Sequence, residues 1–257
     1  MDLDPHFSHP LKTCRWAEKQ IDQFESTERI FFDENPGKEF AYVEFATTQW
    51  VHGIEFAVRP SENLEEQAYR AVGDLRNALD QAVYAACKSL GVNNPKRANF
   101  PIGDSKTHFE RQLASHGGPY RDIPGELHKE LARFEPYYPE SKDSGGNRLL
   151  RALAEMANPN KHQIPLGIEA QTGMRLYGMS GGLISVGTRW DWKGRTELYR
   201  RIPEVPYEID MKLEPRIAFG QVAGMAGEPV TRTLRDMLHM AHDIILSLKA
   251  ETERLLR

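Results

Sequence analysis

The sequence predicts an α+β protein in which a helical bundle packs beside an antiparallel β-sheet. Apolar residues recur at helical spacing near both ends and in the middle of the chain, and shorter β-rich runs lie between them. The order is helix, hairpin, helices, strands, helix, which favours α+β over an alternating parallel architecture. We expect one domain over residues 1–257, helical at about 10–31, 62–157 and 230–257, and β at about 39–59 and 164–222.

The composition is that of a globular protein with a mildly acidic balance. The chain has 257 residues, of which 40% are hydrophobic, enough for a sizeable core. Its formal net charge is −4, whereas a general nucleic-acid coat would be strongly basic. Any contact with RNA is therefore expected to be local.

The chain has the features of a cytoplasmic protein. Cys14 and Cys87 are its only cysteines, which excludes a disulfide scaffold and fits a reducing compartment. The first residues lack the basic and apolar segments of a signal peptide. No apolar run approaches the roughly 18 residues that a membrane span needs. We expect a cytoplasmic location and no membrane contact.

Two predicted elements precede the middle of the chain. A helix over 10–31 is indicated by apolar residues at roughly helical spacing, namely Leu11, Trp16, Ile21, Phe24 and Ile30. Asn35-Pro36-Gly37 ends it. Alternating residues over 40–58 then predict a hairpin with its turn near 46–48, and Pro60 closes it.

The longest predicted helix covers about 62–90. Its apolar seam steps by four and three through Ala68, Val72, Leu75, Leu79, Ala82 and Ala86. An extended segment over 99–103, short helices over 105–115, 124–133 and 147–157, and strands from 164 are expected to follow. The final helix begins near Val230.

A group of polar residues that the seam does not explain lies on the long helix: Arg76, Asn77, Asp80, Gln81 and Tyr84. One interpretation is an Arg76–Asp80 ion pair with solvated amides beside it, worth about 0.2–0.5 kcal/mol. The other is a binding site for a phosphate or an RNA backbone, in which Arg76 binds the anion. Asn77, Gln81 and Tyr84 would then supply hydrogen-bond donors.

The segment Arg76-Asn77-x-x-x-Gln81 resembles the Arg-x4–6-His motif of HEPN domains. The resemblance implies a helical bundle, a homodimer and metal-independent RNA cleavage, in a toxin or phage-defence setting. Asn77 matches the polar residue that follows the motif's Arg. The His of the motif falls at Gln81, and because Gln does not titrate it cannot be a general acid or base.

A second resemblance covers about residues 64–165. The chain is similar to uncharacterised bacterial proteins that share three segments, here Leu75 to Asp80, Phe100 to Ile102 and Asn158 to His162. Asn158 is suited to close a helix, so Lys161 and His162 would lie at a helix-to-strand corner. His162 is either a capped structural residue or the titrating group that Gln81 does not supply, with Lys161 and Asn158 beside it.

Two hypotheses of function follow. In the first, the protein binds or cleaves RNA, with Arg76, Asn77 and His162 as catalytic residues. In the second, it is a non-enzymatic scaffold for a partner protein or small ligand. Neither needs a cofactor. His239, His242 and Asp243 lack an evident further ligand, so no metal site is expected.

Overall fold

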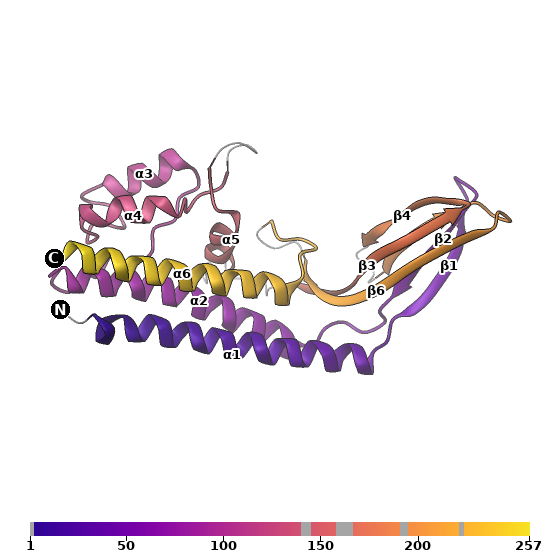
Figure 1. Ribbon diagram of the computed structural model, residues 1–257, viewed down its shortest axis with the longest axis horizontal. Helices are drawn as coiled ribbons and strands as arrows, with labels where there is room; N and C mark the ends of the chain where they lie inside the picture. Colours follow the sequence, from indigo (N-terminus) through magenta and orange to yellow (C-terminus); the bar gives the residue numbers. More distant parts are fainter. Residues whose placement is uncertain (1–2, 140–144, 158–166, 191–194, 221–223) are drawn as a thin grey trace. The chain divides into compact units, whose positions relative to one another are not determined.

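A computed structural model describes residues 3–139, 145–157, 167–190, 195–220 and 224–257 (Figure 1). Its helices are α1 (Asp4–Glu34), α2 (Glu62–Ser89), α3 (Lys106–Ala114), α4 (His128–Arg133), α5 (Arg148–Met156) and α6 (Val230–Leu255), with a 3-10 turn at Gly125–Leu127. Its strands are β1 (Lys38–Glu44), β2 (Gln49–Glu55), β3 (Ile168–Gly181), β4 (Leu183–Trp190), β5 (Arg195–Arg201) and β6 (Tyr207–Phe219). The predicted α+β class with antiparallel pairing is confirmed.

The chain forms two compact units. The helical unit comprises residues 1–22, 67–165 and 232–257, and the β unit comprises residues 23–66 and 166–231. The helical unit carries 22 Lys and Arg against 19 Asp and Glu, a balance of +3; the β unit carries 11 against 18, a balance of −7. The prediction of a single domain stays a prediction.

None of the described helices has the length and hydropathy of a membrane span.

The long helices α1, α2 and α6 lie side by side in the helical unit (Figure 1). The predicted seam of α2 is fully buried at all six positions, which confirms its helical period. Polar side chains join the helices at their margins: Thr13 Oγ1 donates to Gln81 Oε1 at 2.8 Å, and Arg235 Nη2 lies 2.6 Å from Asp22 Oδ1.

Helix α1 differs from the prediction at its start and in its buried face. It begins at Asp4 and continues through Pro10, which lacks the N–H that would bond to the carbonyl of His6 one turn earlier. Trp16 and Ile30, two of the apolar residues whose spacing predicted this helix, are 47% and 54% exposed. Ala17 is buried instead of Trp16, because neighbouring residues on a helix point about 100° apart.

The short helices of the helical unit are fixed by caps. Ser105 Oγ accepts from His108 N at 3.1 Å at the start of α3, and Asn147 Oδ1 accepts from Leu150 N at 2.9 Å at the start of α5. Such caps satisfy backbone donors that a helix leaves open at its first turn. Residues 99–104, which we call the strap, connect the α2 side of the unit to α3.

The β unit holds two sheets among the described residues, whereas the sequence predicted one. The first has the order β1-β2-β5-β4, and the second pairs β3 with β6 from Ile168↔Phe219 to Gly181↔Tyr207. Alternation along a strand shows that one face is buried, but it does not tell which strand is its neighbour. Within this unit, Ile217 N and Thr231 Oγ1 each donate to the carboxylate of Glu28 at 2.6 Å.

Candidate functional site

Arg76 and Asp80 of α2 grip the backbone of Phe100 in the strap. Arg76 Nη2 donates to Phe100 O at 2.8 Å, and Phe100 N donates to Asp80 Oδ1 at 2.8 Å. The two side chains also pair with each other at 2.9 Å, as one of the two interpretations of the sequence predicted. We call this arrangement the clamp. In this chain, the helical segment from Leu75 to Asp80 thus holds the segment from Phe100 to Ile102.

A pocket of about 940 Å³ lies beside the clamp, within the helical unit. Residues of α1, α2, the strap and the end of α5 line it: Trp16, Lys19, Gln20, Tyr69, Arg70, Gly73, Asp74, Arg76, Asn77, Asp80, Asn99, Ile102, Arg151, Ala154 and Ala157. Along α2 the lining extends from Tyr69 to Asp80, about 16 Å at 1.5 Å per residue. The pocket is thus long as well as wide.

The side chains around the pocket favour an anion. Lys19, Arg70, Arg76 and Arg151 face two carboxylates, those of Asp74 and Asp80. Burial raises the pKa of Asp80, although Arg76 and the Phe100 N–H oppose the shift. Burial also raises the pKa of Asp74 against the opposing effect of Arg70. For each of these carboxylates, desolvation therefore shifts the pKa more than the neighbouring cation does.

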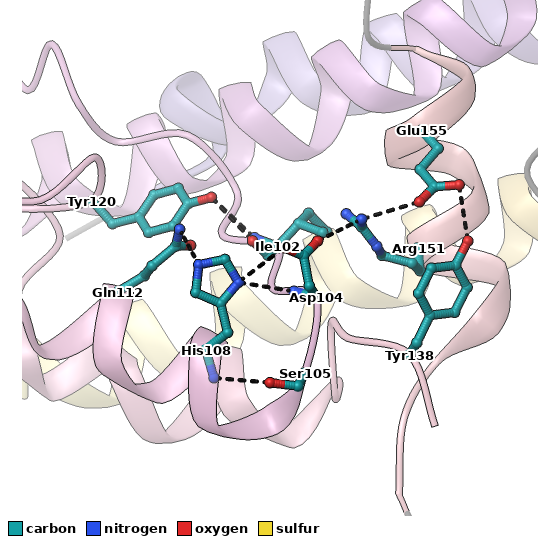
Figure 2. Close-up of polar contacts among 9 residues, drawn as sticks. All are labelled: Ile102, Asp104, Ser105, His108, Gln112, Tyr120, Tyr138, Arg151 and Glu155. Atoms are coloured by element: carbon teal, nitrogen blue, oxygen red, sulfur yellow. Dashed lines mark hydrogen bonds and ion pairs between the residues drawn. The ribbon is translucent and has the colours of Figure 1, made fainter. Parts of the chain in front are cut away.

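Arg151 is held at the pocket wall by two carboxylates (Figure 2). Its Nη2 lies 2.7 Å from Asp104 Oδ1 and 3.0 Å from Glu155 Oε1. Tyr138 Oη donates to Glu155 Oε2 at 2.9 Å, and burial together with this contact raises the pKa of Tyr138. These contacts fix the direction of the Arg151 guanidinium, whose carbon lies 5.2 Å from the Tyr138 ring centre.

The far end of the strap is anchored by a histidine and a tyrosine (Figure 2). His108 Nδ1 lies 3.2 Å from Asp104 Oδ2, and its Nε2 lies 2.8 Å from Gln112 Nε2. Tyr120 Oη accepts from Ile102 N at 3.2 Å. The strap is therefore held at Phe100, Ile102 and Asp104 by separate elements, and the pocket wall that it forms is a fixed one.

Comparisons with known proteins leave the site to be interpreted from its own side chains. No protein-family model, no curated protein and no solved structure matches the chain. Within the ranges that the structure describes, no group of three or more His, Cys, Asp or Glu is arranged to hold a metal ion.

The structure brings together three of the predicted site residues and separates two. Arg76, Asn77 and Asp80 line the pocket. Gln81 points to α1, where Thr13 bonds to it, so its role is to join two helices. Tyr84 is 44% exposed and does not line the pocket.

The other predicted site residues, Asn158, Lys161 and His162, lie outside the described residues. The last described residue before them, Ala157, lines the pocket. The pairing of His162 with Arg76 stays a prediction.

Several residues of the site were missed by the sequence analysis. Trp16 and Tyr69 are 47% and 49% exposed at the pocket, whereas the sequence analysis used Trp16 only as evidence for a helix. The Asp104–His108 and Arg151–Glu155 pairs have the i, i+4 spacing of helix-surface pairs, so that spacing was a usable signal for them. Asn99 had no signal, because its place depends on the clamp.

Proposed function

We propose that the pocket of the helical unit binds single-stranded RNA. The observation that carries the proposal is the joint presence of four cations and two half-exposed aromatic rings around one pocket. Proteins that bind single strands combine cations for the phosphates with aromatic rings on which bases stack. The net positive charge of the helical unit supports the same interpretation.

The resemblance to HEPN domains extends the proposal to cleavage in a homodimer, in a toxin or phage-defence setting. Arg76 would hold the phosphate, Asn77 would orient it and His162 would transfer protons. Arg76 Nη1 is buried and has no hydrogen-bond partner within the described part of the chain, so it retains donors for an anion. Ala157, five residues before His162, lies in the pocket wall.

Binding is tested by fluorescence anisotropy with a labelled ten-nucleotide RNA of mixed sequence. Trp16→Ala, Tyr69→Ala and Lys19→Ala suit this test because they avoid the clamp. Loss of one stacking ring is expected to weaken binding roughly 5- to 100-fold, since stacking is worth about 1–3 kcal/mol per base. Tyr84→Ala and Lys88→Ala, on exposed positions of α2 outside the pocket lining, are the matched controls. No binding by the wild type, or equal loss in pocket and control variants, would overturn the proposal.

Cleavage is tested with the same RNA in the presence and absence of EDTA. Wild type is expected to cut in both, and His162→Ala is expected to bind but not to cut. Cutting that needs a metal would contradict the mechanism, and binding without cutting would limit the function to RNA binding. The mass of the protein by light scattering tests the homodimer.

A small anionic ligand on a non-enzymatic scaffold is the second candidate. A volume of about 940 Å³ falls within the range of small-molecule pockets, about 300–1,000 Å³. Affinity that does not increase with RNA length beyond one nucleotide would favour this candidate.

A further inference from the structure

We infer that the pocket reads the edge of a base, and that Asn77 and Asn99 give it a preference for adenine; this rests on the proposed function. Asn77 lies on α2 and Asn99 lies in the strap, and both are exposed in the lining of the same pocket. Neither side chain forms a hydrogen bond with the described part of the chain. Two amides are thus available to a ligand.

The clamp joins the residues that lie next to these two amides in the sequence. Asn77 follows Arg76, and Asn99 precedes Phe100. Arg76 Nη2 donates to Phe100 O at 2.8 Å, so the backbone beside Asn99 is tied directly to the side chain beside Asn77. With Asp80 accepting from Phe100 N at 2.8 Å, the strap is prevented from rotating about that contact. The backbone positions that carry the two amides are therefore fixed before a ligand enters.

A side-chain amide can both donate and accept hydrogen bonds, which the cations of the pocket cannot. Its oxygen accepts and its nitrogen donates, whereas Arg and Lys side chains only donate. Phosphate oxygens only accept, so cations suffice for a backbone. A side chain with both functions matches a base edge that places an acceptor next to a donor.

Adenine is the base that best fits two such amides. It presents a neighbouring acceptor and donor on both edges, N1 with one N6–H and N7 with the other N6–H. Asn77 and Asn99 could each engage one edge. Guanine places an acceptor beside a donor on one edge only, O6 with N1–H, because its other edge, O6 with N7, holds two acceptors.

The aromatic rings supply the remaining contact. Trp16 and Tyr69 come from different helices and are each about half exposed in the lining. A base stacked on one of these rings would keep its edges free for hydrogen bonds with the amides. The face of the base would be bound by stacking and its edge by hydrogen bonds, as is common in the recognition of single-stranded RNA.

The experiment measures the binding of ten-nucleotide oligo(A), oligo(U) and oligo(C), and of AMP as a competitor, to the full chain. Wild type is expected to bind oligo(A) at least about tenfold more tightly than the other two, since a bidentate amide contact discriminates by about 1–3 kcal/mol. Asn77→Ala and Asn99→Ala are each expected to lose roughly five- to tenfold on oligo(A) and less than about twofold on oligo(U). Asn93→Ala, an exposed amide outside the pocket lining, is the matched control.

The outcomes separate the two proposals. If none of the oligonucleotides and no mixed-sequence RNA binds, the proposed function fails. If all three bind equally, or if the two variants weaken all three alike, RNA binding stands and the adenine preference is overturned. If AMP competes as well as oligo(A), the adenine preference is upheld and the ligand is a nucleotide rather than RNA.

Discussion

Asp80 holds the strap in place and also lines the pocket. Its carboxylate accepts the Phe100 N–H at 2.8 Å and pairs with Arg76 at 2.9 Å, yet burial raises its pKa. The hydrogen bond of Asp80 therefore stabilises the folded protein, whereas burial of its negative charge destabilises it. Substitutions can separate the two effects, because Asn retains an acceptor and Ala does not.

Asp80→Ala is expected to lower the free energy of unfolding by about 2–3 kcal/mol, because it leaves Phe100 N–H and the Arg76 cation without their partner. Asp80→Asn is expected to lose less. Because the folded-state pKa of Asp80 is raised, its stability contribution is complete below the unfolded pKa of about 3.9 and falls as pH rises through the folded pKa.

Urea unfolding of wild type and Asp80→Asn at several pH values between about 3.5 and 7 tests the sign. The stability of the wild type relative to the Asn variant should fall as the pH rises. A relative gain with rising pH would show that the ion pair outweighs the burial.

The two thiols are expected to be inert in the folded protein. Both are buried, and burial raises the pKa of Cys14 to about 11 and that of Cys87 to about 12. The nearby carboxylates of Glu18 and Asp122 add to these shifts. Since the thiolate is the reactive form, a coloured disulfide reagent at neutral pH should react only after unfolding in denaturant. Fast reaction of the native protein would contradict the burial of the cysteines.

At the scale of elements, two glycines of the helical unit should respond oppositely to the same substitution. A Cβ on Gly103, in the strap, would lie 2.5 Å from Phe109 Cβ and 2.7 Å from Phe109 N. A Cβ on Gly73, inside α2, would meet nothing within 4 Å. Gly103→Ala is therefore expected to lower the melting temperature, and Gly73→Ala to stabilise the protein by about 0.5–1 kcal/mol.

Thermal unfolding followed by circular dichroism measures both variants. Because Gly73 lines the pocket, Gly73→Ala should also show whether the added methyl group obstructs RNA. A stabilising Gly103→Ala would mean that the strap does not pack closely on α3.

The helices were predictable because their signal is local. The α2 seam repeats every three or four residues, and Asn147 and Ser105 lie directly before the helices that they cap. The clamp was not predictable from such patterns. Asp80 and Phe100 are 20 residues apart, and an extended strap has no periodicity to reveal its partner. Trp16 belonged to the apolar pattern that predicted α1, yet it is exposed, because the spacing of apolar residues indicates a helix without deciding which of them are buried.

At the scale of the whole molecule, charge is distributed unevenly between the two units. An overall charge of −4 argues against a general nucleic-acid coat, but the helical unit alone carries +3. The expectation of a local RNA contact thus gains support from the division into units, which composition alone did not show. The uneven charge leads to a quantitative expectation about salt.

Binding to RNA should weaken with salt to a limited extent. The slope of log K against log salt is about −0.7 per phosphate neutralised on a single strand, so two to four contacts predict a slope between about −1.4 and −2.8. Lys19→Ala should reduce the magnitude of the slope by about 0.7 if Lys19 neutralises one phosphate. A slope near zero would indicate a ligand held without phosphate contacts, and a much steeper slope would indicate a surface larger than this pocket.

The clamp also constrains how the chain can change in length. Residues 90–98 connect α2 to the strap and are mostly exposed, with Pro95 and Ala98 buried. Exposed loops usually accept insertions at little cost in stability. The end of this connection is also fixed in place. Arg76 and Asp80 bind the backbone of Phe100 and so determine where Asn99 lies. An insertion before Pro95 could be absorbed as a bulge in solvent. One placed directly before Asn99 would leave the protein folded and move the amide away from its counterpart on α2, so the boundary between tolerated and harmful insertions should fall within a few residues.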